Sequence, residues 1–566
     1  MTTLSLALAG ALLLAGCAAS ATPTTTTATP TETSPPTTGA PTTLASTTIA
    51  PPSVAPTTTA PRSDALNGLT CWSTGSYGGG GDLTLVDVTG ETGLLEPLTG
   101  MYGHAAIWSD VDGDDRADLY VGTYADRPEA DYEQRGADGP SPDRLLFGGH
   151  TGFTVDPALT ETRSRSSGGV GADLDGDGDV DLVVVRNISD PALGQTPSQV
   201  LENTGESLRV VEDSGLPEDF GGRSVAVLDY DLDGRLDLFI AEDQYAGGSS
   251  VLLRNEGDLH FSDVTLEAGI PDDVHGLGVA VADLDGDGMA DIFVSGSNRL
   301  FLSDRPGVFG EADSAVFQWE TFGDEDDVAG ASIADVNRDG RLDLAVGHHY
   351  NSTLEQGAMV SVRLYINEGD GRFRDVTEDA GLSPLPTKAP HVELNDLDND
   401  GWPDLVTSAV SGDGPAVYMH EGLEDGVPRF SAPGSLGAQY WTAAPAADYD
   451  RDGRLDVFLL EWEPSLPSRL LRNETATGNW LELSVDAEFG LGLGWRVEVH
   501  DLDTLIGARE ITVTQGYAAG VLPVAHFGLG EREEVTVHLV PSGGADPIVL
   551  ESVQANQHIR WPEGCD

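Results

Sequence analysis

The chain has 566 residues, and its 94 acidic residues against 29 Lys and Arg produce a formal net charge of −65 at pH 7. Such a charge excludes nucleic acid and anionic lipid as direct partners, because both would be repelled, and it favours cations. The 70 glycines suit a fold with many tight turns.

The N-terminal residues predict an export signal. An apolar run from Leu4 to Ala15 is too short to span a bilayer, and it leads into Leu14-Ala15-Gly16-Cys17. This end resembles the lipobox of bacterial lipoproteins. We therefore expect residues 1–16 to be removed and Cys17 to be lipidated, which would hold the protein at the cell membrane, facing outward. The alternative is an ordinary secretory signal cleaved nearby, and either reading exports the protein.

A spacer and two cysteines frame the rest of the chain. Residues 17–62 are almost entirely Thr, Pro, Ala and Ser, a composition that cannot bury enough apolar surface to fold and that stays extended. Besides Cys17 the chain has only Cys71 and Cys565, one near each end of the folded region. In an exported protein this pair predicts a disulfide.

Residues 63–477 are dominated by one repeated motif. Seven nine-residue segments follow the template Asp-x-Asp-x-Asp-Gly-x-x-Asp, at intervals of 52 to 63 residues. Short β-rich runs surround each copy, such as 224–228 before a motif and 237–240, 251–253 and 261–265 after it. Four short strands in each of seven units predict an all-β, seven-bladed β-propeller. The seventh unit lacks a clear fourth strand, and we expect residues 85–89 to supply it and close the ring.

The spacing of the motif favours calcium. Aspartates at positions 1, 3 and 5 of a tight loop can converge on one ion, and Ca²⁺ prefers six to eight oxygen ligands. Position 6 should adopt positive φ, which Gly allows in six units and Asp115 tolerates in the first. Position 7 varies, as a residue that binds through its backbone carbonyl with a free side chain would. An EF-hand would instead require a Glu at position 12 and flanking helices.

We therefore predict up to seven Ca²⁺ sites, with ligands from positions 1, 3, 5, 7 and 9 of each motif. In chain order these are Asp110, Asp112, Asp114, Arg116 and Asp118; Asp173, Asp175, Asp177, Asp179 and Asp181; Asp229, Asp231, Asp233, Arg235 and Asp237; Asp283, Asp285, Asp287, Met289 and Asp291; Asp335, Asn337, Asp339, Arg341 and Asp343; Asp396, Asp398, Asp400, Trp402 and Asp404; and Asp448, Asp450, Asp452, Arg454 and Asp456.

The repeats resemble FG-GAP/VCBS repeats, the calcium-loop units of integrin α propellers. Residues 478–566 lose the motif, and runs 480–485, 511–513 and 535–539 alternate like strands. This small β module resembles the ASPIC/UnbV domain at 478–481, 506–509 and 526–530. The combination resembles bacterial members of the cartilage acidic protein family. The resemblance implies calcium binding and an adhesive, cell-surface setting, and it implies no established reaction.

The sequence favours a binding module over an enzyme. It has no Gly-x-Ser-x-Gly and no His-Glu-x-x-His motif. His348-His349 reads as a pair of exposed loop histidines rather than a catalytic or metal site. A structural or calcium-storing envelope protein and an extracellular polymer-degrading enzyme remain alternatives. We expect a monomer whose partner is an extracellular protein or glycan and which touches the membrane only through its lipid.

The loops at the end of the ring opposite the motifs are the predicted binding surface, with packing as the alternative role. Their aromatic and histidine residues are Tyr102, His104, Tyr124, Tyr132, Tyr245, His275, Tyr350, His391, Tyr440 and Trp441.

Overall fold

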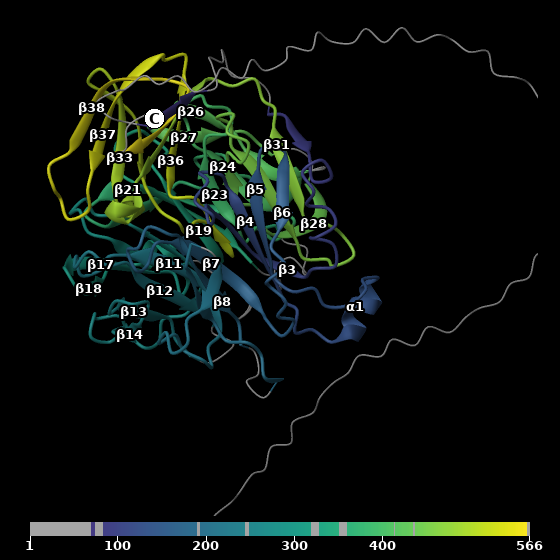
Figure 1. The fold of residues 1–566 in the computed structure, drawn as a ribbon. Coiled ribbons are helices and arrows are strands. Elements are labelled where there is room, and N and C mark those ends of the chain that lie inside the picture. The colour runs from purple at the N-terminus through teal and green to yellow at the C-terminus, as the bar shows by residue number, and fades with distance from the viewer. Residues whose placement is uncertain are drawn as a thin grey trace, which may run out of the picture. The chain divides into compact units, whose positions relative to one another are not determined.

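A computed structural model describes residues 70–73 and 83–562, except 189–192, 206, 244–247, 319–327, 350–358, 412–413 and 434–435. The predicted signal segment and spacer, with Cys17, lie outside these residues, as do Cys565, Tyr245 and Tyr350. The predicted all-β class is confirmed (Figure 1). The helices whose bounds the structure describes are α1 (Glu129–Arg135) and the 3₁₀ turns η2 (Ala315–Phe317) and η3 (Ala487–Gly492). None of the described helices has the length and hydropathy needed to cross a membrane.

Five sheets follow the chain in order, and each contains a motif hairpin and the two strands after it, paired antiparallel. They are β3 (Gly103–Ser109), β4 (Asp118–Thr123), β5 (Arg144–Gly149) and β6 (Gly152–Val155); β7 (Ser166–Ala172), β8 (Asp181–Arg186), β9 (Gln199–Asn203) and β10 (Leu208–Val210); β11 (Gly222–Leu228), β12 (Asp237–Glu242), β13 (Val251–Asn255) and β14 (Phe261–Asp263); β15 (Gly276–Ala282), β16 (Asp291–Gly296), β17 (Arg299–Arg305) and β18 (Val308–Glu311); and β19 (Val328–Ala334), β20 (Asp343–His348), β21 (Arg363–Gly369) and β22 (Arg372–Asp375).

The sixth and seventh motif hairpins share one eight-stranded sheet, because β28 pairs with both β24 and β30. The described strand pairing therefore does not separate these two units, and the number of seven blades stays a prediction. The strands are β23 (Val392–Asn395), β24 (Asp404–Ser411), β25 (Gly414–Tyr418), β28 (Leu436–Ala443), β29 (Ala446–Ala447), β30 (Asp456–Glu461), β31 (Arg469–Asn473) and β2 (Leu85–Asp87), with β26 (His420–Glu424) and β27 (Val427–Phe430) as a separate hairpin. The predicted closure is confirmed: β2 pairs antiparallel with β31, and Val86 lies opposite Arg472.

The first strands of successive units lie side by side, β3 against β7, β7 against β11, and so on to β19 against β23. This convergence explains why the strands are rich in small residues. In β7 every residue is buried, and a Cβ added to Gly168 would lie 2.4 Å from the carbonyl oxygen of Arg223 on β11. A larger side chain there would push neighbouring sheets apart. The observed arrangement is a β-propeller of repeated motif hairpins.

The C-terminal domain, which we define as β32–β39, contains two further sheets around a common core of residues such as Leu481, Val497 and Val537. One has the order β1 (Thr70–Ser73), β39 (Gln557–Trp561), β32 (Asn479–Val485) and β36 (Val524–Gly530). The other has the order β34 (Thr504–Glu510), β33 (Arg496–Asp501), β37 (Glu534–Val540) and β38 (Ile548–Gln554). Residues 70–73, expected to belong to the propeller, thus extend a sheet of this domain.

The predicted strand at 511–513 is wrong. These residues leave β34 and enter a central segment, residues 514–520, that lies along the inner strands of the propeller. Its short strand β35 (Ala519–Gly520) pairs in parallel with β3, and the Gly516 N–H donates to Ala331 on β19 at 2.9 Å. The apolar alternation arises because Ile511 is buried in the C-terminal core and Val513 in the propeller core.

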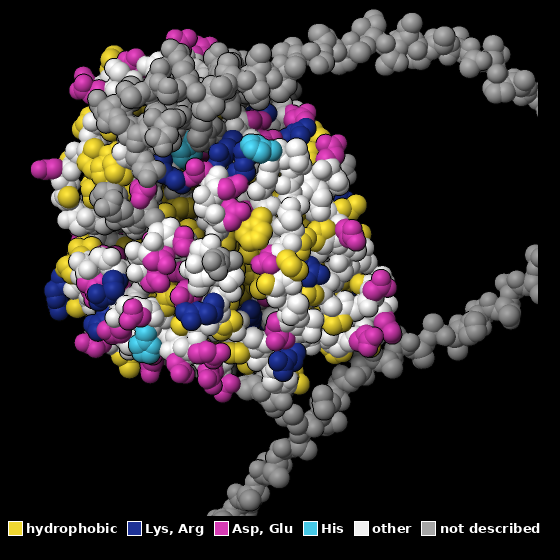
Figure 2. Space-filling model, viewed as in Figure 1, with side chains coloured by type: hydrophobic (Ala, Val, Ile, Leu, Met, Phe, Trp, Pro, Cys, Tyr) yellow, Lys and Arg dark blue, Asp and Glu magenta, His cyan; other side chains and the backbone are white. Residues whose placement is uncertain are grey.

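Acidic side chains, in magenta, are spread over the visible face of the molecule, and Lys and Arg side chains, in dark blue, lie among them (Figure 2). The motifs hold only part of the acidic residues.

Candidate metal-binding loops

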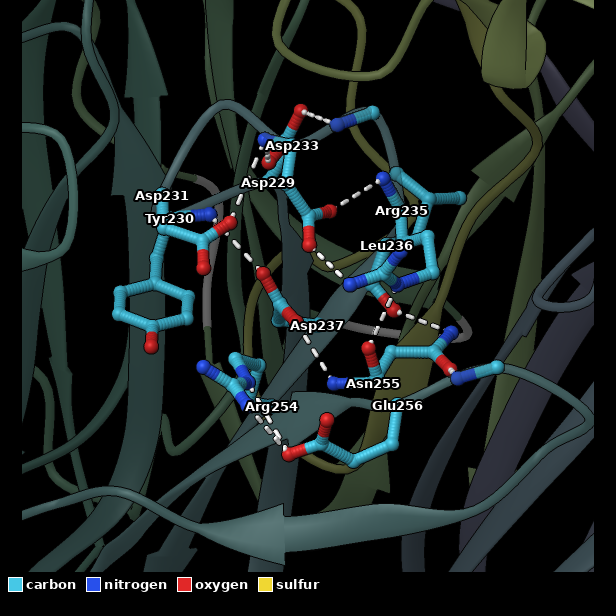
Figure 3. Close-up of polar contacts among 12 residues, drawn as sticks. Asp229, Tyr230, Asp231, Asp233, Arg235, Leu236, Asp237, Arg254, Asn255 and Glu256 are labelled. Carbon is cyan, nitrogen blue, oxygen red and sulfur yellow. Dashed lines mark hydrogen bonds and ion pairs between the residues drawn. The ribbon is translucent and has the colours of Figure 1, made fainter.

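Each motif forms the loop between the first two strands of its unit. Figure 3 shows the third loop, in which the carboxylates of Asp229, Asp231 and Asp237 lie close together. Carboxylate oxygens from positions 1, 3 and 9 lie within 4.8 Å of one another in the groups Asp110/Asp112/Asp118, Asp173/Asp175/Asp181, Asp229/Asp231/Asp237 and Asp283/Asp285/Asp291. Three converging carboxylates repel in the absence of a cation, so each group could hold a metal ion.

The position-1 carboxylate closes the loop on itself. Oδ1 of Asp229 accepts the N–H of Asp233 at 3.0 Å, and Oδ2 accepts the N–H of Gly234 at 2.9 Å. Burial, reinforced by the charge of Asp115, raises the pKa of the equivalent Asp110 to about 6. The loop thus holds carboxylates in a position where protonation or a bound cation relieves their repulsion.

The position-9 carboxylate is the most buried of the group. Asp237 accepts the N–H of Tyr230 at 3.1 Å and that of Asn255 at 2.8 Å. Burial raises the pKa of Asp237 and Asp291 to about 8, although these backbone N–H groups favour the ionised form. This aspartate therefore supports the loop as well as contributing to the acidic cluster.

The backbone of the loop has positive φ at two positions. The predicted one, position 6, is confirmed, with φ between 83° and 99° at its six glycines and 64° at Asp115. Position 4 also has positive φ, for example 86° at Gly286, 55° at Asn399 and 56° at Leu232. The recurrence of Gly or Asn at position 4 in four of the seven motifs was the available signal for this second turn.

Positions 5 and 7 of the loop also contact each other. Arg235 at position 7 donates through Nε to the carbonyl oxygen of Asn255 at 2.7 Å and pairs with Asp233 at position 5. Oδ1 of Asp233 also accepts the backbone N–H of Arg235 at 2.9 Å. The guanidinium thus spans the loop and the adjacent strand. In each of the four groups above, the position-5 carboxylate accepts the backbone N–H of position 7.

Sequence reasoning missed an asparagine at the end of the third strand. The side-chain amide of Asn255 donates to the carbonyl oxygen of Leu174, at position 2 of the preceding motif, at 2.8 Å. The same bridge to the preceding motif is made by Asn203, Asn367 and Asn473, and by His420 through its ring nitrogen. The Asn that ends Leu-x-Asn or Tyr-x-Asn in four of the seven units was the available signal.

The C-terminal domain contacts the motif loops directly. The N–H groups of Gly478 and Gly530 donate to Asp398 and Asn399 of the sixth loop at 3.1 and 2.9 Å, and Glu510 accepts the N–H of Asp283 at 3.0 Å. A cavity of about 830 Å³ lies between this domain and the first, second and seventh loops. The loops are thus partly roofed by a second domain.

The roof of this cavity carries a buried histidine–glutamate group. Nδ1 of His526 and Nδ1 of His558 lie 3.2 and 3.3 Å from the two carboxylate oxygens of Glu482. Burial opposes ionisation of Glu482, but the hydrogen bonds from the two histidines lower its pKa to about 2. Nε2 of His526 lies 2.8 Å from Oδ1 of Asn399 in the sixth motif, which links this group to the loop.

Most of the aromatic residues predicted to form a binding surface are packing groups. Tyr102, Tyr124 and Tyr132 are buried in one cluster, and the rings of Tyr102 and Tyr132 lie 4.9 Å apart. His104, His391 and Trp441 are also buried, while His275 and Tyr440 are partly exposed. The packing alternative therefore holds for the buried six.

The expectation of exposed loop histidines at 348–349 is wrong for His348, whereas His349 follows the strand and is half-buried. His348 is the last residue of β20, is buried, and has Nε2 3.0 Å from the carbonyl oxygen of Thr387. The ring of His349 lies 5.9 Å from that of Tyr517 in the central segment. Both side chains belong to the packing around the middle of the propeller.

A family model described as FG-GAP-like repeat matches residues 173–240, 229–294, 354–407 and 396–459. Cartilage acidic protein 1 of Mus musculus is 28% identical over 382 residues, which are 62% of this chain and 57% of that protein. The Homo sapiens protein of the same name is 29% identical over 358 residues, 58% of this chain and 52% of that protein. The chain thus spans little more than half the length of these relatives.

Integrin alpha-4 of Xenopus laevis is 36% identical over 109 residues, 18% of this chain and 10% of that protein. Among solved structures, rhamnogalacturonan lyase YesW has a TM-score of 0.36 at 14% identity, over 66% of this chain and 72% of that one. A TM-score of this size supports no conclusion about activity. The chain therefore carries FG-GAP-like repeats, as its motifs predicted, and is similar in sequence to cartilage acidic protein 1 and to an integrin α chain.

Proposed function

We propose that the motif loops bind Ca²⁺, up to seven ions per chain, and that the ions stabilise the propeller. The observation that carries this proposal is the convergence of the carboxylates at positions 1, 3 and 9 within 4.8 Å. Hard carboxylate and carbonyl oxygens are the ligands that Ca²⁺ prefers, and its flexible coordination suits loops of differing sequence. Mg²⁺ is smaller and demands stricter octahedral geometry, so it should substitute poorly.

The test is a thermal melt in Ca²⁺, in Mg²⁺ and in chelator, combined with a metal count on the purified protein. Binding to the folded state stabilises by mass action, by about 2.7 kcal/mol per site at one hundred times the dissociation constant. We expect chelation to lower Tm sharply and Mg²⁺ to restore little of the loss. A melt that ignores chelator, with fewer than about three Ca²⁺ per chain, would contradict the proposal.

We further propose that the protein is exported, anchored by lipid at Cys17, and acts as a cell-surface binding or adhesion module rather than an enzyme. The similarity to an integrin α chain supports an adhesive role. The cavity beneath the C-terminal domain, lined by loop residues such as Asp110 and Asp173 together with Arg560, offers a polar site next to the proposed ions. A ligand bound there could contact both domains.

Two measurements test the setting and the ligand. Mass spectrometry of the membrane-extracted protein should find a lipidated Cys17 at the mature N-terminus, whereas an unmodified N-terminus beyond residue 17 would reject the anchor. Glycan and protein arrays probed with and without Ca²⁺ should reveal a calcium-dependent ligand. Binding that persists in chelator would show that ligand recognition does not depend on Ca²⁺ in the motif loops.

A further inference from the structure

A second kind of metal-ligating group lies in the C-terminal domain and uses no residue of the motifs. Glu498 and His500 are two positions apart on β33, so their side chains project from the same face of the sheet. His538 on β37 is paired directly opposite Glu498. Residues paired across antiparallel strands have Cβ atoms about 4.5–5.5 Å apart, so this register brings three side chains to one point.

The three side chains converge closely. Oε2 of Glu498 lies 3.2 Å from Nε2 of His500 and 3.9 Å from Nδ1 of His538. One ligand atom from each residue lies within 4.8 Å of the other two. The side chains are between 16% and 31% exposed, so an ion could reach them from solvent.

The second oxygen of the carboxylate is held from outside the group. Nη2 of Arg496 lies 2.9 Å from Oε1 of Glu498, and the same guanidinium donates to the carbonyl oxygen of Gly340 in the fifth motif loop. This contact leaves Oε2 directed toward the histidines. Partners of this kind orient a ligating carboxylate in metal sites.

Simple ion pairing explains the group poorly. The imidazole rings of His500 and His538 have centroids only 4.3 Å apart, so two protonated rings would repel. One carboxylate can compensate at most one of them. Two neutral imidazoles beside a carboxylate are instead a ligand set for a divalent transition metal, and Ca²⁺ disfavours such nitrogen ligands.

We propose that Glu498, His500 and His538 bind one divalent transition-metal ion, with Zn²⁺ the best match. Two histidines and a glutamate form a three-ligand zinc set that leaves a coordination position open to water or a ligand. The site joins β33 to β37 next to the fifth motif loop. It is chemically distinct from the motif loops and does not depend on whether they bind Ca²⁺.

Zinc binding to the full chain tests the proposal, with excess Ca²⁺ present to occupy the motif loops. We expect one Zn²⁺ to be retained per chain after dialysis, and the visible absorption of bound Co²⁺ to report nitrogen ligation. His500→Gln, His538→Gln and Glu498→Gln should each weaken Zn²⁺ affinity by at least about 100-fold, because even outer-shell changes cost about 10–100-fold. Unchanged Tm values in Ca²⁺ would show that these variants fold.

The matched control is His558→Gln, in the second histidine–glutamate group of the same domain. There the two histidines occupy both oxygens of Glu482, and Nε2 of His558 lies 2.8 Å from Oγ of Ser484. This variant should retain its zinc. The proposal is overturned if the wild-type chain retains no Zn²⁺, or if the three variants bind it as the wild type does. Loss of zinc in His558→Gln alone would also overturn it by assigning the ion to the other group.

Discussion

The backbone N–H of Asn255 donates to Oδ1 of Asp237 at 2.8 Å, which joins the third strand of the unit to the position-9 carboxylate of its own motif. Because the side chain of Asn255 also reaches the carbonyl oxygen of Leu174 in the preceding motif, one residue connects two successive loops. Asn255 therefore ties the third motif loop to the second through buried hydrogen bonds.

Replacing Asn255 with Ala should lower the free energy of unfolding by about 1–3 kcal/mol, because it leaves the buried carbonyl oxygens of Leu174 and Leu236 without this donor. Chemical denaturation in Ca²⁺ measures the change. Ser303→Ala is the matched control, since in that unit the carbonyl oxygen of Tyr230 in the preceding motif accepts the N–H of Gly307 instead. Equal losses in the two variants would show that the bridge contributes nothing specific.

Replacing Asp283, Asp285 and Asp287 with Asn should remove one Ca²⁺ from the metal count and lower Tm in Ca²⁺. In chelator the same variant should be as stable as the wild type or more so, because three mutually repelling carboxylates are gone. The control variant combines Glu267→Gln, Asp272→Asn and Glu531→Gln, which are exposed and lie outside the motifs. If the control lowers the calcium count equally, net charge rather than the loop holds the ion.

The slope of stability against pH should have opposite signs in the metal-free and the Ca²⁺-bound protein. Burial raises the pKa of Asp118 and Asp181 to about 7 and that of Asp237 and Asp291 to about 8, whereas Asp in an unfolded chain titrates near about 3.9. Between about pH 4 and pH 8 the metal-free folded state therefore binds more protons than the unfolded state, and its stability rises as pH falls.

With Ca²⁺ bound, protons compete with the ion for the same oxygens, so acidification over this range should lower stability. Thermal melts of metal-free and Ca²⁺-saturated protein, taken from about pH 8 to about pH 5, measure the two slopes. Slopes of the same sign would mean that the buried carboxylates do not ligate the ion.

The predicted Cys71–Cys565 disulfide also has a direct test. Cys71 lies on β1, paired opposite Ile559 on β39 near the end of the chain. Non-reducing peptide mapping should recover the linked peptides. Reduction should lower the free energy of unfolding by about 2–4 kcal/mol, because the bridge restricts the conformations open to the unfolded chain. Two free thiols in freshly exported protein would reject the bridge.

Much of the loop chemistry could be predicted because it is local. Asp229, Asp231 and Asp237 lie within nine consecutive residues, so their spacing predicted that they converge. The glycine at position 6 likewise predicted the positive φ found there. Strand alternation and the 52-to-63-residue repeat were sufficient to predict the propeller. They also predicted that the strand now seen as β2 pairs with the last unit, where it lies beside β31. In each case the deciding interactions lie within one repeat or recur in every repeat.

Other features depended on contacts that spacing cannot specify. The Arg235–Asp233 pair was missed because position 7 varies among repeats, and the run 511–513 was misread because Ile511 and Val513 enter two different cores. Aromatic residues expected on a surface, such as Tyr102 and Tyr132, pack against each other instead. An apolar side chain in a loop is compatible with either outcome until its neighbours are known.

The sequence by itself determined the acidic loops, the hairpins that carry them and the repeat that arranges them, since these follow from the order of residues along a short stretch of chain. Only the tertiary structure decided that the C-terminal domain lies on those loops and that residues 514–520 run along the inner strands. It also decided that His538 lies opposite Glu498, forty positions away. Such pairings are set by strand register and by burial of apolar surface between distant segments, which sequence order constrains only weakly.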